Sequence, residues 1–163
     1  MFQPNGLTEL PFGLPGRIYR SAMPYRREDP DGEIFQAYRE HNIALVVMLV
    51  EADEALRSTG RNLAAFYASQ GLQVVHCPIP DFSIPDWRAL ENALAVVQAH
   101  AQAGVNVAVH CYAGVGRTGT FMACLAAKLM GMSGAEAIAW VRQHIPDALE
   151  NQDQVQFVLE FAA

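Results

Sequence analysis

The chain has 163 residues, a hydrophobic content of 52% and a formal net charge of −6. This length suits one domain with a sizeable core. The acidic balance excludes a protein that coats nucleic acid or carries a polybasic membrane patch, because its long-range field repels phosphate backbones. We therefore expect neither nucleic acid nor a membrane as a partner.

The sequence also bears on the compartment. The longest apolar run, residues 44–50, is far shorter than the roughly 18 residues that a membrane span needs. Residues 1–10 lack the basic and apolar regions of a secretion signal. Three widely spaced cysteines do not form a disulfide framework, so we expect free thiols in a reducing compartment. The prediction is a soluble, cytoplasmic protein.

The first half of the chain contains two strand-like and two helix-like segments. Residues 16–21 are flanked by prolines and predict an edge strand or one arm of a hairpin. Residues 34–41 predict a short helix, and the aliphatic run 43–50 is typical of a strand buried on both faces. Residues 54–70 have helical spacing, with Gly71 as the expected C-cap.

The second half alternates in the same way. It predicts strand 72–77, helix 86–103, strand 105–110 and helices 118–130, 133–144 and 152–161. Alternating strands and helices indicate an α/β fold with a mostly parallel central sheet of about four to five strands and helices on both faces. Ligand sites in such sheets form beyond the carboxyl ends of the strands. Cys111 and the segment after Cys77 follow two such ends, so we expect them to meet.

The densest chemistry lies in residues 109–120, which read V-H-C-Y-A-G-V-G-R-T-G-T between a predicted strand and a predicted helix. Five residues separate the thiol of Cys111 from the guanidinium of Arg117. At such a turn the backbone N–H groups can point at one centre beside the positive end of the helix dipole, which favours a bound dianion. The predicted phosphate-binding positions are Tyr112, Ala113, Gly114, Val115, Gly116 and Arg117. Glycines at Gly114, Gly116 and Gly119 permit the close backbone approach that this requires.

This loop is similar to the signature loop His-Cys-x5-Arg-Ser/Thr of the cysteine-based protein phosphatases. In addition, I79-P-D-F-S-I-P85 resembles the movable acid loop of that superfamily. The chain length and I18-Y-R-S-A-M-P24 resemble its small, atypical dual-specificity branch. The resemblance covers most of the chain and implies one phosphatase domain over residues 1–163. It places N-terminal strands and loops in 1–30, a general-acid loop at 78–86 and the phosphate-binding loop at 110–119.

The chemistry of the loop can be argued from its residue types. Cationic and helix-terminal sites favour the thiolate, so we predict that Cys111 attacks phosphorus and forms a phosphocysteine. Arg117 is expected to hold two phosphoryl oxygens bidentately. The resemblance implies that Thr118 donates to the cysteine sulfur and that His110 orders the loop. We expect no metal and no cofactor, with phosphate-like oxyanions binding the loop.

A leaving group needs a proton, and a carboxylic acid can supply it. Asp81 is the predicted general acid and base, because it follows a strand end within the acid loop. Asp86 is the alternative, but its place before a helical run favours an N-cap. Of the two glutamines near the last helix, Gln154 is preferred over Gln152 as a substrate contact. Cys77 is either a packed strand residue or a resolving partner for oxidised Cys111.

The substrate is the least determined part. Tyr112 and Val115 are not cationic, whereas phosphoinositide-directed relatives commonly place lysines at such positions. We therefore predict a phosphorylated protein or peptide, with a shallow site for phosphotyrosine that leaves phosphoserine and phosphothreonine open. Two alternatives stand: an inactive module that binds phosphorylated ligands, and a phosphatase of a non-protein phosphomonoester. The sequence predicts neither the physiological substrate nor the oligomeric state.

Overall fold

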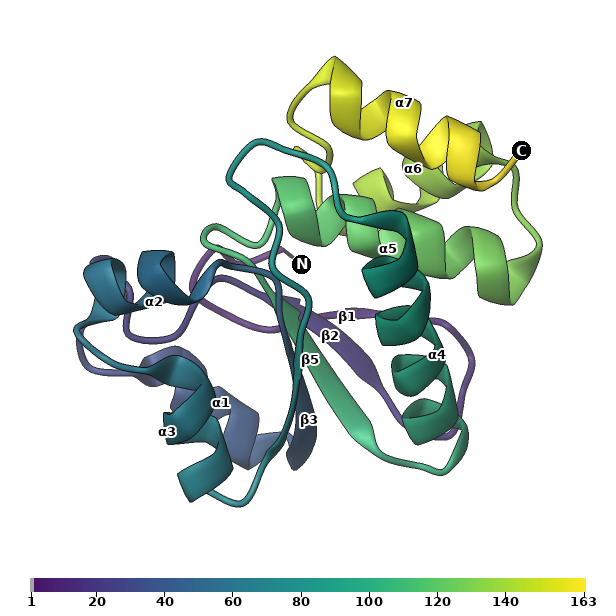
Figure 1. The fold of residues 1–163 in the computed structure, drawn as a ribbon. Coiled ribbons are helices and arrows are strands. Elements are labelled where there is room, and N and C mark those ends of the chain that lie inside the picture. Colours follow the sequence, from purple (N-terminus) through teal and green to yellow (C-terminus); the bar gives the residue numbers. More distant parts are fainter. Residues whose placement is uncertain (1) are drawn as a thin grey trace.

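The computed structural model describes residues 2–163, which fold around a five-stranded sheet with the order β1-β2-β5-β3-β4 (Figure 1). The strands are β1 (Thr8–Leu10), β2 (Ile18–Ser21), β3 (Ile43–Met48), β4 (Gln73–His76) and β5 (Asn106–His110). Only β1 pairs antiparallel, with β2, and the other three pairings are parallel. The predicted mostly parallel α/β sheet is confirmed.

Helices cover both faces of this sheet, as the alternating pattern predicts. They are α1 (Glu33–Glu40), α2 (Ala52–Thr59), α3 (Leu63–Ser69), α4 (Trp87–Gln102), α5 (Gly116–Met130), α6 (Gly134–His144) and α7 (Gln152–Phe161). In Figure 1, α1 to α3 lie on one side of the sheet and α4 and α5 on the other, with α6 and α7 outside α5. Helices α6 and α7 both pack against α5.

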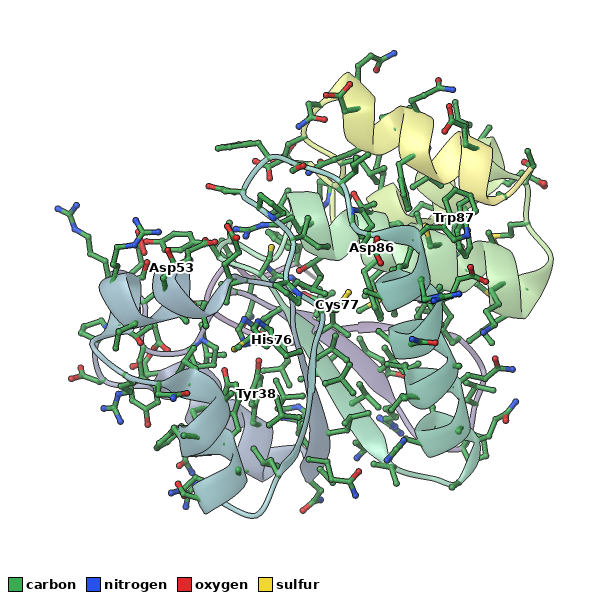
Figure 2. All side chains as sticks on the ribbon, in the orientation of Figure 1. Tyr38, Asp53, His76, Cys77, Asp86 and Trp87 are labelled. Carbon is green, nitrogen blue, oxygen red and sulfur yellow. The ribbon has the colours of Figure 1, made fainter. Side chains whose placement is uncertain are left out.

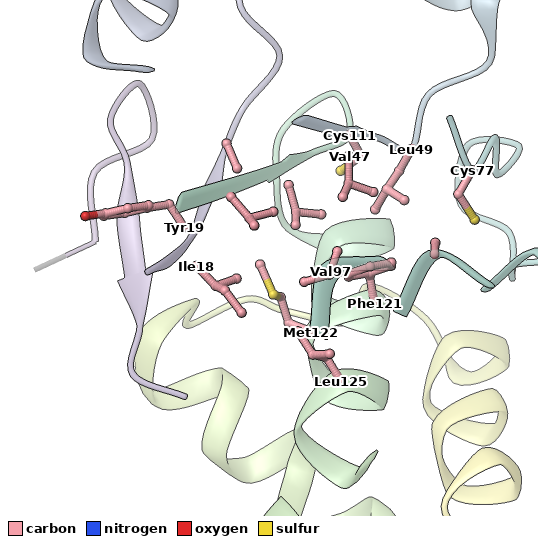
Figure 3. Close-up of a cluster of buried hydrophobic side chains, with 14 of the residues drawn as sticks. Ile18, Tyr19, Val47, Leu49, Cys77, Val97, Cys111, Phe121, Met122 and Leu125 are labelled. Atoms are coloured by element: carbon pink, nitrogen blue, oxygen red, sulfur yellow. The ribbon is translucent and has the colours of Figure 1, made fainter. Parts of the chain in front are cut away.

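The hydrophobic core joins the central strands to α4 and α5. Val47 of β3, Val97 of α4 and Phe121 of α5 are fully buried and lie in one cluster (Figure 3). Every residue of α5 from Gly116 to Ala126 is buried. Small residues in this stretch allow α5 to be enclosed on all sides. The helix that begins at the phosphate-binding loop is thus part of the core.

Two predictions about the first half are corrected. The segment predicted as an edge strand is interior, because β2 lies between β1 and β5 and all four of its residues are buried. The edge position belongs to β1, a three-residue strand that is too short to show a pattern in sequence. The hairpin-arm alternative is confirmed by the antiparallel pairing of β2 with β1.

The helix predicted over residues 54–70 is two helices. Gly60 ends α2 in the left-handed conformation with φ 71°, and the side chain of Asn62 caps α3 by accepting from the N–H of Ala65. The actual C-cap of α3 is Gln70, and Gly71 follows with φ 82°. The break turns Leu56 to the surface, where 54% of it is exposed.

Helix starts in the second half agree with their sequence signals. Asp86 caps α4 by accepting from the N–H of Ala89 at 2.9 Å, and Ser133 and Glu136 form a capping box at the start of α6. Trp87, the first residue of α4, is 42% exposed and packs its ring near Phe157 of α7. Within residues 2–163, none of the helices has the length and apolar character to span a bilayer.

Candidate active site

The parallel pairing of three strands brings two chemically rich segments together. Met48 at the end of β3 is in register with both His76 of β4 and His110 of β5. The residues that follow β4 and β5 therefore leave the sheet at the same edge, one strand apart. The predicted meeting of the phosphate-binding loop and the acid loop is confirmed by the ion pair between Arg117 and Asp81.

Cys111 lies at the bottom of the phosphate-binding loop. It follows β5 directly and only 2% of it is exposed. The backbone N–H of Gly114 donates to Cys111 Sγ at 3.3 Å. An N–H donor directed at sulfur stabilises a thiolate over a thiol, because the charged acceptor forms the stronger hydrogen bond.

The outer side of this loop is held by Arg20, a fully buried residue of β2. Its Nε donates to the carbonyl of Gly114 at 3.1 Å and its Nη2 to the carbonyl of Ala113 at 2.7 Å. Burial lowers the pKa of Arg20 to about 10, which leaves the guanidinium charged at neutral pH. Carbonyls fixed on the outer side turn the corresponding N–H groups toward the sulfur.

Close approach of the backbone requires glycine at Gly114. Gly114 has φ 75°, and a Cβ there would lie 2.3 Å from both Arg20 Nη2 and Ser21 O. A Cβ on Gly116 would lie 1.9 Å from Glu150 Oε1, the end of a flexible side chain that can move away. The expectation that the loop needs glycine is thus met for steric reasons at Gly114, against Arg20 and the backbone of Ser21.

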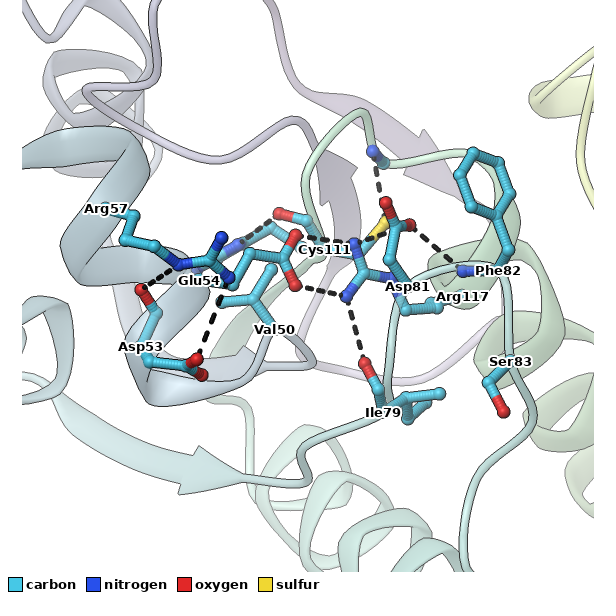
Figure 4. A network of polar contacts seen from close by, with 12 residues as sticks. Val50, Asp53, Glu54, Arg57, Ile79, Asp81, Phe82, Ser83, Cys111 and Arg117 are labelled. Carbon is cyan, nitrogen blue, oxygen red and sulfur yellow. Dashed lines mark hydrogen bonds and ion pairs between the residues drawn. The ribbon is translucent and has the colours of Figure 1, made fainter.

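Arg117, in the first turn of α5, is the centre of a polar network (Figure 4). Its Nη1 and Nη2 donate to the two carboxylate oxygens of Glu54 at 2.8 and 2.9 Å, and Nη1 also donates to Ile79 O at 2.9 Å. Nη2 lies 3.1 Å from Asp81 Oδ1. Among residues 2–163 no acceptor pairs with its Nε.

Glu54 was not predicted as part of the site. It lies on α2, with a side chain that is 13% exposed, and its fork-to-fork pairing fixes the plane of the Arg117 guanidinium. Three acids, Glu51, Asp53 and Glu54, follow the end of β3, so the sequence did place carboxylates at the correct edge. Nothing in the spacing indicates which of them turns inward.

Asp81 is the acid-loop carboxylate that reaches the site. Its side chain is 54% exposed, and Oδ1 accepts from the backbone N–H of Phe82 at 3.0 Å as well as pairing with Arg117. Asp86 lies at the start of α4 (Figure 2), where its carboxylate is used as the N-cap. Asp81, not Asp86, is therefore the carboxylate of this segment that lies beside Arg117.

The two residues that flank this frame are buried. His110 Nδ1 lies 2.9 Å from Cys111 O, and Nε2 lies 2.8 Å from the hydroxyl of Tyr67. A carbonyl only accepts, so Nδ1 carries the proton and Nε2 accepts from Tyr67. Burial lowers the pKa of His110 to about 4, so the ring is neutral. Thr118 Oγ1 is buried and makes no hydrogen bond within residues 2–163, which leaves its proton available to a ligand or to the sulfur.

The remaining predicted contacts differ in where they point. Tyr112 donates through its hydroxyl to Glu28, at 3.0 Å from Oε2. Gln154 is fully buried, and it accepts from Glu150 N at 2.8 Å and donates to Ser83 O at 3.2 Å. Gln154 thus contacts the acid loop, whereas Gln152 is exposed. The contact of Gln154 with substrate stays a prediction.

Cys77 is separated from Cys111 by a strand. Cys77 follows β4 and Cys111 follows β5, and β3 runs between them, so their backbones are about 9–10 Å apart from strand spacing. A disulfide needs Cα atoms within about 7 Å. Leu49 lies between the two sulfurs (Figure 3). Burial raises the pKa of Cys77 to about 11. The geometry favours the packed-residue reading of Cys77.

Within residues 2–163, no cluster of three or more His, Cys, Asp or Glu side chains forms a candidate metal site. The reactive groups at this edge of the sheet are the buried thiol of Cys111, the guanidinium of Arg117 and the partly exposed carboxyl of Asp81.

Comparisons with known proteins agree with this arrangement. A family model described as "Polymorphic toxin system, DSP-PTPase phosphatase" matches residues 21–130. The crystal structure of Tk-PTP in the active form has a TM-score of 0.78 and 30% identity, covering 95% of this chain and 96% of that chain. A kinase-associated phosphatase with serine at its catalytic-site cysteine has a TM-score of 0.85 at 20% identity over 99% of this chain and 96% of that chain, a likeness of fold.

A curated relative is protein tyrosine phosphatase domain-containing protein 1 of Danio rerio, which is 34% identical over 82 residues. The match covers 50% of this chain and 11% of the relative. The related proteins of Mus musculus and Bos taurus are matched over 11% and 17% of their lengths. The chain therefore spans only a small part of these relatives.

Proposed function

This chain belongs to the DSP-PTPase phosphatases, in the family described as a polymorphic toxin system phosphatase, and from that premise we propose that it hydrolyses phosphorylated protein side chains through a phosphocysteine. The observation that carries the proposal is the assembly of Cys111, Arg117 and Asp81 at one edge of the sheet. Arg117 and Asp81 are 3.1 Å apart, and the sulfur accepts from the loop backbone.

In the first step the Cys111 thiolate attacks phosphorus and the bond from phosphorus to the leaving oxygen breaks. Asp81, as the protonated acid, gives its proton to that oxygen. In this proposal Thr118, whose buried hydroxyl is without a partner among the described residues, donates that hydroxyl to the sulfur and stabilises it. In the second step water attacks phosphorus, Asp81 takes a proton from it, and sulfur leaves as the thiolate.

Some of the N–H donors of Arg117 are taken by other residues, and the rest are left for the phosphoryl group. Glu54 and Ile79 O occupy Nη1, and Glu54 also occupies one proton of Nη2. Nε has no acceptor among the described residues, and Nη2 lies 3.1 Å from Asp81 Oδ1 as an ion pair. A bidentate phosphate on these two positions displaces Asp81 from Nη2, and the freed carboxyl can then face the leaving oxygen.

The mouth of the site supports a substrate without extra phosphates. A hollow of about 430 Å³ beside the loop is lined by Glu51, Glu54, Arg57, Ser58, Asp81 and Tyr112. Its carboxylates outnumber its single cation, and Arg57 is itself paired with Asp53 at 3.7 Å. Coulomb repulsion disfavours a polyphosphorylated headgroup here. The surroundings suit one phosphate on a peptide.

Turnover of p-nitrophenyl phosphate in excess chelator tests the reaction. We expect activity in the native chain and none in Cys111→Ser, while Arg117→Ala weakens both turnover and vanadate inhibition. A clean native protein without turnover would overturn the phosphatase proposal and favour a binding module. Equal vanadate affinity in Arg117→Ala would contradict the bidentate contact.

A second experiment addresses the substrate. Phosphopeptides, phosphoinositides and nucleoside monophosphates are compared by kcat/KM on the native chain. We expect the phosphopeptides to be the best substrates. A preference for one of the other two classes would replace the protein substrate with a non-protein phosphomonoester.

A further inference from the structure

The acid loop has little structure of its own to hold it. Between β4 and α4 it is attached to the sheet at Ile79, whose N–H donates to Leu49 O at 2.9 Å, and it closes one turn from Ser83 N to Pro80 O at 2.9 Å. Phe82 and Ile84 are 60% and 41% exposed. Burial of apolar side chains therefore does not fix the middle of the loop.

The conformation at Phe82 requires an external restraint. Its φ is 60°, in the left-handed region, which costs a residue with a Cβ about 1–2 kcal/mol. Such conformations persist when surrounding contacts hold them. The same residue donates its N–H to Asp81 Oδ1. The backbone at Phe82 therefore helps to set the direction of the Asp81 carboxylate, together with Arg117.

The restraint comes from the first turn of α7. Asn151 Nδ2 donates to Phe82 O at 2.7 Å, and Gln154 Nε2 donates to Ser83 O at 3.2 Å. These two amides are themselves held. Asn151 Oδ1 accepts from Gln154 N at 3.0 Å, and Gln154 Oε1 accepts from Glu150 N at 2.8 Å in a fully buried position.

We propose that Asn151 and Gln154 form an amide clamp that positions the general acid, a role that rests on the proposed phosphatase function. Arg117 holds Asp81 only until a phosphate takes its place on Nη2. From then on, the clamp and the Phe82 N–H are the contacts that keep the carboxyl beside the leaving oxygen. Asn151 and Gln154 are positioning residues, because they act through Asp81 and contact two carbonyls of the loop.

The chain offers variants that separate the clamp from the helix cap. In Asn151→Ser and Asn151→Asp the side-chain oxygen still caps α7, because Ser and Asp are good N-caps, but the amide donor to Phe82 O is lost. Gln152→Ala is the matched control, since Gln152 is an exposed glutamine in the same turn. Urea unfolding checks that all variants are folded.

The readout is the dependence of kcat/KM on the leaving group. For phenyl phosphate, whose phenoxide needs a proton, we expect Asn151→Ser to be about fivefold slower, the loss of one hydrogen bond. For 2,4-dinitrophenyl phosphate, whose leaving group needs no proton, we expect less than a twofold change. Vanadate inhibition stays within twofold, and Gln152→Ala resembles the native chain on both substrates.

A double-mutant cycle makes the test specific to Asp81. If Asn151 acts through the acid, Asn151→Ser adds nothing to Asp81→Asn, so the double variant equals Asp81→Asn alone. Independent, multiplicative losses, or equal losses on both aryl phosphates, would overturn the clamp. The two proposals fail in different ways. A native chain without turnover would overturn the phosphatase proposal. An active native chain that is slowed by Asp81→Asn but gives one of the contrary results above would overturn the clamp alone.

Discussion

The phosphate-binding loop and the acid loop meet at Arg117 but are held in opposite ways. Buried side chains fix the first: Arg20 is fully buried behind it and His110 is fully buried beneath it. The second has exposed side chains and is held by two amides from α7. The difference shows that the loop proposed to bind phosphate is part of the core, whereas the segment that carries the proposed proton donor is attached to the core by a few hydrogen bonds.

The strongest way to break the buried loop is Gly114→Ala. The alanine has to keep the left-handed φ of 75°, and its Cβ would lie 2.3 Å from Ser21 O and from Arg20 Nη2. We expect a loss of about 4 kcal/mol in the free energy of unfolding, from strain and overpacking together. Gly13→Ala is the control, because Gly13 has φ 76° with open space around it and should show only the strain of about 1–2 kcal/mol. Equal losses in urea unfolding would contradict the packing argument.

Acid should weaken the same loop through His110. The pKa of His110 is lowered by burial from 6.5 to about 4, so between these pH values the unfolded chain binds more protons. The contribution of neutral His110 to the free energy of unfolding is therefore complete above pH 6.5, and it falls by about 3 kcal/mol as the pH is lowered to 4. Urea unfolding at several pH values measures this. The control variant is His110→Gln, which has no imidazole to titrate. We expect its free energy of unfolding to depend less steeply on pH between 4 and 6.5. An unchanged pH dependence would show that His110 is not the group responsible.

Removal of the supporting cation should affect chemistry more than fold. Arg20→Met leaves the carbonyls of Ala113 and Gly114 without their donor, so we expect kcat/KM to fall about thirtyfold, or roughly 2 kcal/mol. Alkylation of Cys111 by iodoacetate at pH 6 should slow as well. Arg20→Lys keeps the charge but not the two-donor fork, and we expect an intermediate effect. Native rates in Arg20→Met would show that the loop orders itself without Arg20.

The smallest effect is expected in the acid loop. In Phe82→Gly the strain of a left-handed φ of 60° is relieved, which stabilises the folded chain. Glycine also gives the unfolded chain more conformational entropy, which destabilises the fold, so the two free-energy changes nearly cancel. We expect the free energy of unfolding to change by less than about 1 kcal/mol. A loss above about 2 kcal/mol would mean that the Phe82 ring packs into the fold, against its exposure, and that the two loops are held alike.

The sequence predicts the part of the site that is local in the chain. Cys111 and Arg117 belong to one short segment between a strand and a helix, and their spacing together with the glycines, His110 and Thr118 around them predicts an anion-binding turn. Asp81 could be placed because it follows a parallel strand, and such ends share one edge of the sheet. The alternation of strands and helices sufficed for the sheet and for the two helical layers.

The contacts that complete the site are distant in sequence. Arg20 and Gly114 are 94 residues apart, and Arg117 and Glu54 are 63 apart. Which cation lies behind the loop and which of several acids turns inward depend on strand order and on the break between α2 and α3. The interior place of β2 depends likewise on a three-residue partner strand, which carries no periodic signal.

The enclosure of α5 has a consequence for how the protein responds to heat. Its first eleven residues are buried, from Gly116 to Ala126, and they include the arginine of the site. The amide hydrogens from Gly119 onward, which are bonded within the helix, can exchange with solvent only when the core around them opens. Heating should therefore abolish oxyanion binding in the same cooperative transition that melts the sheet, with no cooler step in which the fold survives and the binding loop is lost.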